Sequence, residues 1–315
     1  MRVARAPGKA MLFGEYAVLD GAPAIVAAVD RYAIAHVPAT DGPSPTPFVA
    51  AATKRALARL VDDGITATTR APIVDSSALY AGDRKLGLGS SAAVTVAAHG
   101  AVLTAAGVPL DERKADLFAA CNEAHAEAQG ARGSGADIAA AVFGGVLAFR
   151  VDGQPSPVAW PADLAITFVD TGVAASTAGR VARWRDLSAR RPAEHRALRD
   201  RLGALAADFL ASLGAGRADG LDLVRRWNRA LDDLASAIDA EIVTPAHRRI
   251  AALADEMGGA AKPSGAGGGD LAVCFAPPDA ALPLKKRLAA DGFNVLDLAA
   301  GAPGLATIEL EDLAP

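Results

Sequence analysis

The chain has 315 residues, 51% hydrophobic and 22% charged, enough for about two globular domains with a sizeable core. Its net charge of −4 and its pI near 5.8 argue against a nucleic-acid-binding surface, which is normally basic. No uninterrupted apolar run reaches about 18 residues, and residues 1–7 lack the apolar segment of a signal peptide. We therefore expect a soluble cytoplasmic protein, a monomer or homodimer, with neither nucleic acid nor membrane as a partner.

In chain order, the first half predicts short strands, then helices. Short apolar or alternating runs indicate strands at 2–6, 10–13, 24–29 and 32–37. A proline-rich loop at 41–47 precedes a short helix at 53–60 and a hairpin at 65–74. Apolar periodicity and capping residues then predict helices at 92–106, 112–129 and 136–143, followed by a strand at 145–150.

Three prolines within residues 152–161 mark the expected boundary between two domains, 1–158 and 159–315. The second domain begins with an apolar strand at 164–170, and long helices follow to about residue 257. A strand at 271–275, a helix at 279–290 and strands at 293–298 and 306–310 complete the chain. Cys121 and Cys274 are too few for a disulfide framework and are predicted to be buried thiols.

A Gly-Ser loop at residues 85–93 (KLGLGSSAA) is the strongest functional signal. Its two glycines allow a positive φ and close approach to a ligand. The loop leads into an uncharged helix, whose first N–H groups and positive dipole end suit a phosphate. The predicted nucleotide-binding residues are Lys85, Gly87, Leu88, Gly89, Ser90, Ser91 and Ala92. A tight loop into a core helix is the competing interpretation.

Three further segments carry candidate residues. Lys9 follows Pro-Gly at the edge of a strand, where its ammonium either projects into a cleft or lies on the surface. Residues 262–270 (KPSGAGGGD) concentrate glycines between a helix and a strand, which is costly in entropy unless backbone must pass close to something. Asp137 stands in the first turn of a helix, after a Gly-Ser turn, where it either complements the helix dipole or handles a proton.

Other classes of nucleotide enzyme fit poorly. The chain has no G-x-x-x-x-G-K-[ST] motif of a P-loop NTPase. The run 87–92 matches a loose dinucleotide fingerprint, but polar residues 81–85 stand where a buried strand is required. Neither a Cys/His cluster nor a G-x-S-x-G elbow is present.

Taken together, the segments resemble the GHMP kinase superfamily. Its three motifs occur in order as 6–9 (APGK), 87–93 (GLGSSAA) and 262–267 (KPSGAG). Within the superfamily the likeness is greatest to the phosphomevalonate kinases, through 14–19 (GEYAVL), 133–137 (GSGAD), 171–177 (TGVAAST) and 267–270 (GGGD). Mevalonate kinases usually carry a His where this chain has Tyr16, and a P-S-G-x-D turn where it has GSGAD. Residues 41–83 match no motif of the family.

The resemblance implies a two-domain α+β fold, with an N-terminal ribosomal-protein-S5-like domain, a C-terminal ferredoxin-like domain and the site between them. It also implies ATP, Mg²⁺ and transfer of the γ-phosphoryl group to 5-phosphomevalonate, with mevalonate phosphorylation as the alternative. Lys9 and Asp137 would be catalytic, and Ser91, together with Ser90, would ligate Mg²⁺. The implied acceptor-binding residues are Lys9, Glu15, Tyr16, Arg132, Ser134, Gly135, Ser176, Thr177, Ser264, Gly265, Ala266 and Gly267.

Two assignments stay open at this stage. Arg132 and Arg180 are alternative ligands for the acceptor's phosphate. Ser176 and Thr177 serve either that phosphate or the cap of the following helix. His125 is interpreted as a packed helix residue rather than a catalytic one.

Overall fold

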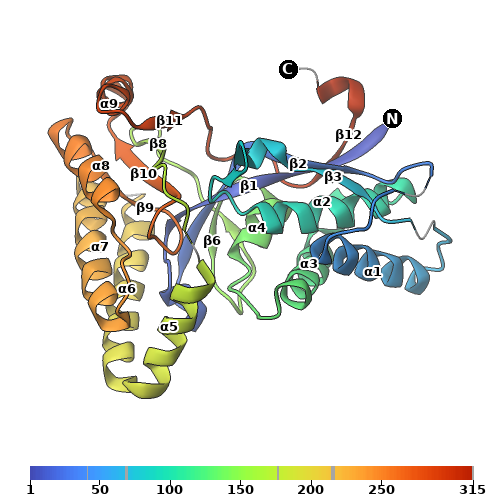
Figure 1. Ribbon diagram of the computed structural model, residues 1–315, viewed down its shortest axis with the longest axis horizontal. Coiled ribbons are helices and arrows are strands. Elements are labelled where there is room, and N and C mark those ends of the chain that lie inside the picture. The colour runs from blue at the N-terminus through green and yellow to red at the C-terminus, as the bar shows by residue number, and fades with distance from the viewer. Residues whose placement is uncertain (41, 68–69, 176, 214–216, 314–315) are drawn as a thin grey trace.

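Two β-sheets carry the fold and lie side by side (Figure 1). The computed structural model describes residues 1–40, 42–67, 70–175, 177–213 and 217–313. The first sheet has the strand order β12-β1-β2-β6-β7, with β3 pairing on β2, and the second has the order β11-β8-β10-β9. A separate ribbon, β4-β5, comes just before the Gly-Ser loop.

The first sheet is built on two long strands. Its members are β1 (Arg2–Phe13), β2 (Ala24–His36), β3 (Ile73–Asp75), β6 (Val146–Phe149), β7 (Ser156–Pro157) and β12 (Ala306–Glu309); the ribbon is β4 (Tyr80–Ala81) and β5 (Arg84–Lys85). Each long strand replaces two predicted short ones. The register of β1 on β2 shifts between Pro7 and Gly8, so Pro7 sits at an irregularity where a missing N–H is tolerated.

Four helices cover one face of this sheet, below it in Figure 1: α1 (Pro47–Asp62), α2 (Ser90–Ala105), α3 (Lys114–Gln129) and α4 (Ala136–Phe143). The predicted helices at 92–106, 112–129 and 136–143 are confirmed within a few residues. α2 packs directly on β1 and β2, with α1 and α3 outside it. Because α2 is covered on both sides, nearly all its residues are buried, which explains its uncharged sequence.

The second half stacks helices against the second sheet, at the left of Figure 1. Its strands are β8 (Ala165–Asp170), β9 (Ala260–Pro263), β10 (Leu271–Ala276) and β11 (Asn294–Leu296). Its helices are α5 (Thr177–Arg190), α6 (Pro192–Ser212), α7 (Arg217–Ile238), α8 (Pro245–Glu256) and α9 (Pro278–Ala290). Among the described residues, none of the helices combines the length and hydropathy needed to span a bilayer.

Aromatic residues join the two halves into one core. Phe13, at the end of β1, stacks on Phe209 of α6 with ring centroids 3.9 Å apart. Phe13 also contacts Trp227 of α7, and Phe209 contacts Phe275 of β10. The end of β1 is therefore fixed by the helices and sheet of the second half. Cys121 and Cys274 are buried and free, as predicted.

One feature differs from the sequence prediction. The hairpin predicted at 65–74 is wrong: within the described part of that stretch only residues from 73 onward form a strand, β3, which pairs with β2. The strand predicted at 306–310 is present as β12, and it pairs with β1, with Arg2 opposite Glu309. Leu305, just before β12, packs closely on Gly100 of α2. A Cβ on Gly100 would lie 2.7 Å from Leu305 Cδ1.

The histidine inside α2 generates a prediction about acid stability. His99 is 1% exposed, and burial lowers its pKa to about 4, against the opposing effect of a backbone hydrogen bond at Ala52. The unfolded chain binds this proton at a pKa near 6.5, so stability is complete above that pH and is lost as the pH falls toward 4. We expect the loss to be on the order of 3 kcal/mol for this residue.

Urea denaturation at pH 7 and pH 4.5 measures this loss, and His99→Gln should reduce it. Burial also lowers the pKa of His247 to about 4. The dependence of stability on pH that remains in the variant should therefore come from His247. An unchanged pH dependence in His99→Gln would contradict the assignment to His99.

Candidate active site

Lys9 lies across the N-terminal end of α2, which is called its mouth below. Its backbone N–H donates to the carbonyl of Leu88 at 2.8 Å, which ties β1 to the Gly-Ser loop. Its side chain covers Gly89, where a Cβ would stand 2.9 Å from Lys9 Cγ and 3.0 Å from Cε. Gly89 also caps α2 with a φ of 70°, so both conformation and space require glycine here. The side chain of Lys9 therefore lies against the N-terminus of α2.

The first turn of α2 also contributes the hydroxyl of Ser91 to the site. The hydroxyl of Ser91 and Nε2 of His125, on α3, are 3.0 Å apart. Burial lowers the pKa of His125, and the charge of Asp137, in the first turn of α4, opposes this shift. His125 therefore contacts the predicted Mg²⁺ ligand and lies within the electrostatic reach of Asp137. It is packed, as expected, against Phe48, but its hydrogen bond to Ser91 was not foreseen, because no spacing relates residues on different helices.

Lys9 and Asp137 do not contact each other: in the described chain no hydrogen bond or ion pair joins them. The charge of Lys9 instead acts on two other groups. Burial raises the pKa of Asp270 and Lys9 opposes this shift, whereas burial lowers the pKa of Lys262 and Lys9 lowers it further. Asp270 lies under Gly87 of the loop, where a Cβ on the glycine would come within 2.7 Å of Asp270 Cβ. The catalytic roles assigned to Lys9 and Asp137 stay predictions.

The turn between β9 and β10 closes the site from the second half. Lys262 Nζ donates to Oε1 of Glu15 at 2.5 Å, and both side chains are buried. The amide of Gly265 donates to the same oxygen at 3.3 Å, and the hydroxyl of Tyr16 donates to the carbonyl of Ala266 at 2.6 Å. These contacts attach the segment after β1 to the glycine-rich turn.

Ser264 completes this attachment. Its hydroxyl donates to the carbonyl of Met11 and accepts from the Met11 amide, both at 3.0 Å. Gly267 lies so close to the carbonyl of Ile242 that a Cβ would be 2.5 Å from it. Glu15, Tyr16 and Ser264 thus engage protein partners, and their predicted contacts with an acceptor stay predictions.

A second ion pair joins the halves beside the Gly-Ser loop. Arg84, in β5, donates to Asp170, at the end of β8, at 2.5 Å. Burial alone would raise the pKa of Asp170, but the bonds from Arg84 and from the Gly172 amide bring it below its ordinary value. Asp270 follows the glycine-rich turn and accepts a bond from the amide of Ala175 at 2.9 Å. The segment before α5 is therefore held against both the turn and the loop.

The remaining predicted residues are more scattered. Lys85 and Arg132 are exposed, and the guanidinium of Arg185 donates to the backbone carbonyl of Arg132 at 2.6 Å. Gly135, with a φ of 86°, begins α4, and Ser134 accepts from the amide of Ala136 at 3.3 Å. Thr177 is the exposed first residue of α5. Ser176 lies outside the described residues.

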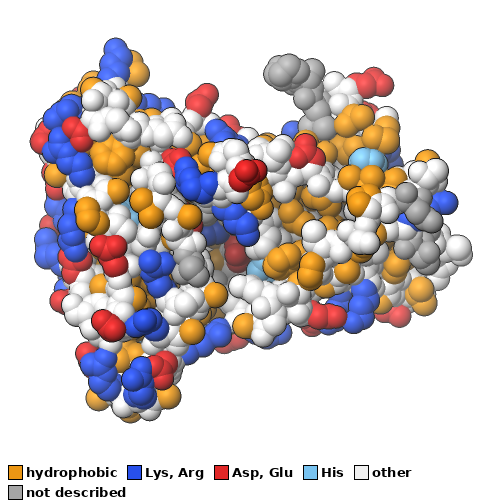
Figure 2. All heavy atoms as spheres, viewed as in Figure 1, with side chains coloured by type: hydrophobic (Ala, Val, Ile, Leu, Met, Phe, Trp, Pro, Cys, Tyr) orange, Lys and Arg blue, Asp and Glu red, His pale blue; other side chains and the backbone are white. Residues whose placement is uncertain are grey.

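Basic side chains gather in this region although the protein is acidic overall. Figure 2 shows the surface hollowed between the two halves, with Lys and Arg side chains along the hollow. Within the described residues, no group of three His, Cys, Asp or Glu side chains could hold a metal ion by itself. A cation here would need ligand oxygens from elsewhere, which fits Mg²⁺ bound by one or two protein oxygens together with phosphates and water.

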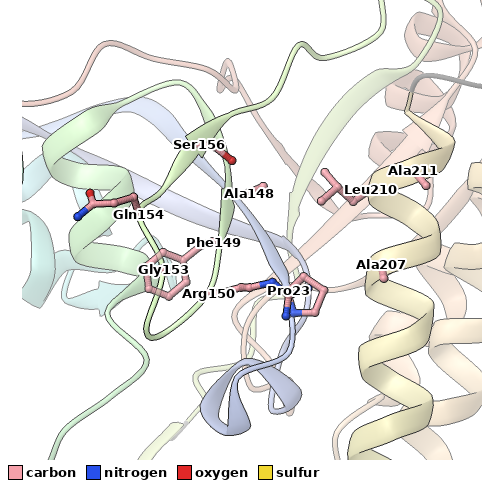
Figure 3. A pocket seen from close by; sticks show the side chains of 10 residues that line it. All are labelled: Pro23, Ala148, Phe149, Arg150, Gly153, Gln154, Ser156, Ala207, Leu210 and Ala211. Carbon is pink, nitrogen blue, oxygen red and sulfur yellow. The ribbon is translucent and has the colours of Figure 1, made fainter.

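An apolar pocket of about 420 Å³ lies away from these residues (Figure 3). Its walls come from the β6–β7 region, Pro23 and α6, with Phe149, Arg150 and Leu210 among the lining side chains. None of the predicted site residues lines it. We place the chemistry at the charged hollow instead, because phosphate transfer requires cations and backbone donors.

The buried ion pair generates a prediction about stability. Burial raises the pKa of Glu15 and lowers that of Lys262, and their mutual attraction opposes both shifts. Lys262→Met leaves the carboxylate buried without its cation, so the free energy of unfolding should fall by about 3–5 kcal/mol. Adding Glu15→Gln removes the stranded charge, so the double variant should lose less than the sum of the two single variants. Urea denaturation of the four proteins measures the coupling, and additive losses would contradict it.

Comparisons with known proteins show the family of the chain. Residues 48–145 match the family of the GHMP kinases N terminal domain. A phosphomevalonate kinase from Streptomyces sp. (strain CL190) is 30% identical over 345 aligned positions, which cover 88% of this chain and 90% of that protein.

Two solved structures share the fold. The Lin0012 protein from Listeria innocua superposes with a TM-score of 0.85 at 23% identity, over 98% of this chain and 100% of that one. Streptococcus pneumoniae phosphomevalonate kinase, in complex with phosphomevalonate and AMPPNP, superposes with a TM-score of 0.79 at 20% identity, over 95% and 100% of the chains. The predicted two-domain fold is thereby confirmed. This chain belongs to the GHMP kinases and, within them, to the family of the phosphomevalonate kinases.

Proposed function

We propose that this protein transfers the γ-phosphoryl group of ATP to the phosphate of (R)-5-phosphomevalonate, forming 5-diphosphomevalonate. The observation that carries the proposal is the position of Lys9, which covers Gly89 at the mouth of α2 and acts electrostatically on Lys262 beside the β9–β10 turn. Phosphoryl transfer depends mainly on positioning and on neutralising phosphate oxygens. The name of the Streptomyces relative supports this acceptor.

The nucleotide side is assigned to residues 85–92. The amides at the start of α2 and the glycines with positive φ form a concave set of donors for the phosphates of ATP. Ser91 would offer its hydroxyl oxygen to Mg²⁺, and Nε2 of His125, 3.0 Å away, holds that hydroxyl in place. Mg²⁺ bound with the nucleotide supplies positive charge to the phosphate oxygens.

The acceptor side needs little proton chemistry. A phosphate monoester has a second pKa near 6, so the attacking oxygen is mostly deprotonated at neutral pH. Lys9 then neutralises the charge that accumulates between donor and acceptor, and Asp137 acts on the electrostatics of the site rather than as a strong base. An alcohol acceptor would need a stronger base.

The rival assignments are mevalonate kinase and a silent relative that only binds nucleotide. Purified protein should be given ATP with mevalonate and, separately, with phosphomevalonate, and ADP release followed. We expect turnover with phosphomevalonate. Turnover with mevalonate alone would favour the first rival, and turnover with neither would contradict the proposal.

Lys9→Met should lower kcat/KM for phosphomevalonate by more than about tenfold, roughly 1.4 kcal/mol of transition-state stabilisation, because it removes the ammonium between the two phosphates. Lys286→Met, at an exposed position of α9, is the control and should leave kcat/KM unchanged. A smaller decrease for Lys9→Met would remove Lys9 from the chemistry.

Asp137→Asn should lower kcat by about tenfold or more, because the amide keeps the shape of the side chain but removes its charge. The KM for ATP should change less than kcat, since α2 and the loop stay intact. An unchanged kcat would show that Asp137 only complements the dipole of α4.

A further inference from the structure

Arg180 occupies space that only a glycine at residue 268 leaves open. A Cβ on Gly268 would lie 1.6 Å from Arg180 Nη2 and 2.0 Å from its Cζ, so the guanidinium rests directly on the β9–β10 turn. The Nε of Arg180 donates to the carbonyl of Glu241 at 2.9 Å, which fixes the side chain from behind. Arg180 stands in the first turn of α5, which begins at Thr177.

The surroundings of this guanidinium belong to the predicted acceptor site. Burial raises the pKa of Tyr16, and the charge of Arg180 opposes this shift. The hydroxyl of Tyr16 donates to the carbonyl of Ala266 on the same turn. The guanidinium of Arg180 therefore lies against the turn that carries the third motif.

Other arginines of the region are used differently. Arg132 is exposed, and its backbone carbonyl accepts a hydrogen bond from Arg185. Arg183, one turn further along α5, donates to the carbonyls of Ile238 and Asp239. Arg132 and Arg180 were the two candidate ligands for the acceptor's phosphate, and of these Arg180 lies against the glycine-rich turn.

We propose that Arg180, held against Gly268, is the residue by which the site selects a phosphorylated acceptor over the corresponding alcohol. A guanidinium presents N–H donors in a plane that matches two oxygens of a phosphate, and the pair gains from opposite charge. A primary alcohol offers neither the charge nor the second oxygen. This inference rests on the proposed function, because it concerns the same acceptor.

The test compares Arg180→Gln and Arg180→Lys with the unmodified protein. Calorimetric titration gives Kd for phosphomevalonate, mevalonate and AMPPNP, and steady-state assays give KM and kcat. We expect Arg180→Gln to raise Kd and KM for phosphomevalonate by about 100-fold, with Kd for AMPPNP and mevalonate within about twofold. Arg180→Lys keeps the charge but loses the paired donors, so its effect should be intermediate. Arg183→Gln, on the same helix, should leave all three constants unchanged.

Gly268→Ala tests whether the contact with Gly268 positions the Arg180 side chain. Its Cβ would displace the guanidinium, so the variant should lose phosphomevalonate affinity like Arg180→Gln. Gly258→Ala is the matched control, since Gly258 has a φ of 75° against 76° for Gly268 and open space around its Cβ. The double variant Arg180→Gln/Gly268→Ala should bind phosphomevalonate no more weakly than Arg180→Gln, because both changes remove the same contact.

The outcomes separate this inference from the function on which it rests. Failure of the unmodified protein to phosphorylate phosphomevalonate overturns both. Normal turnover together with an Arg180→Gln variant that keeps its phosphomevalonate Kd overturns the role of Arg180 alone. An equal loss for AMPPNP and mevalonate would show a structural role instead, and it would also overturn the inference.

Discussion

The site depends on one buried ion pair, between Glu15 and Lys262. Removing two charges from water costs several kcal/mol each, and only their close pairing offsets this cost. Glu15 follows the first strand of one sheet, and Lys262 lies in β9 of the other, 247 residues further along the chain. Neither half could bury its own charge alone. The two halves of the fold are therefore joined at the same place where the site is assembled.

Strand β1 transmits this constraint to the Gly-Ser loop. The strand carries Lys9 near its middle and Phe13 at its end, two residues before Glu15. An extended backbone advances about 3.3 Å per residue, so the Cα atoms of Lys9 and Phe13 lie roughly 13 Å apart along the strand. Aromatic stacking of Phe13 on Phe209 fixes one end, and the bond from Lys9 to Leu88 fixes the other. The distance between the α2 mouth and the β9–β10 turn is thus set by a single rigid strand.

Local signals made part of this predictable from the sequence. Gly87 and Gly89 have positive φ, and an uncharged helix does begin at Ser90. These are properties of a few adjacent residues, and backbone geometry alone dictates them. Likewise Asp137 stands in the first turn of α4, where a short apolar helix was expected.

Contacts between distant segments were not predictable in the same way. The bond between Ser91 and His125 joins two helices, and no periodicity in either helix reports the other. The return of β12 to β1 depends on which sheet edge is open, which a four-residue strand does not encode. A hairpin was expected at 65–74, yet within the described residues of that stretch only those from 73 onward pair with another strand. Tertiary context decides the pairing of short strands more than their own composition does.

This difference also explains why the segment assigned to the nucleotide is easier to recognise in the sequence than the residues assigned to the acceptor. The segment assigned to the nucleotide is one continuous loop and helix, and backbone amides bind a phosphate whatever side chains surround them. The segments assigned to the acceptor come from β1, the α3–α4 connection, α5 and the β9–β10 turn. A change of one side chain in such a composite surface, for example at Arg180 or Gly268, can alter the acceptor while the fold and the nucleotide loop stay the same. Acceptor identity therefore depends on a few contacts that only the folded chain brings together.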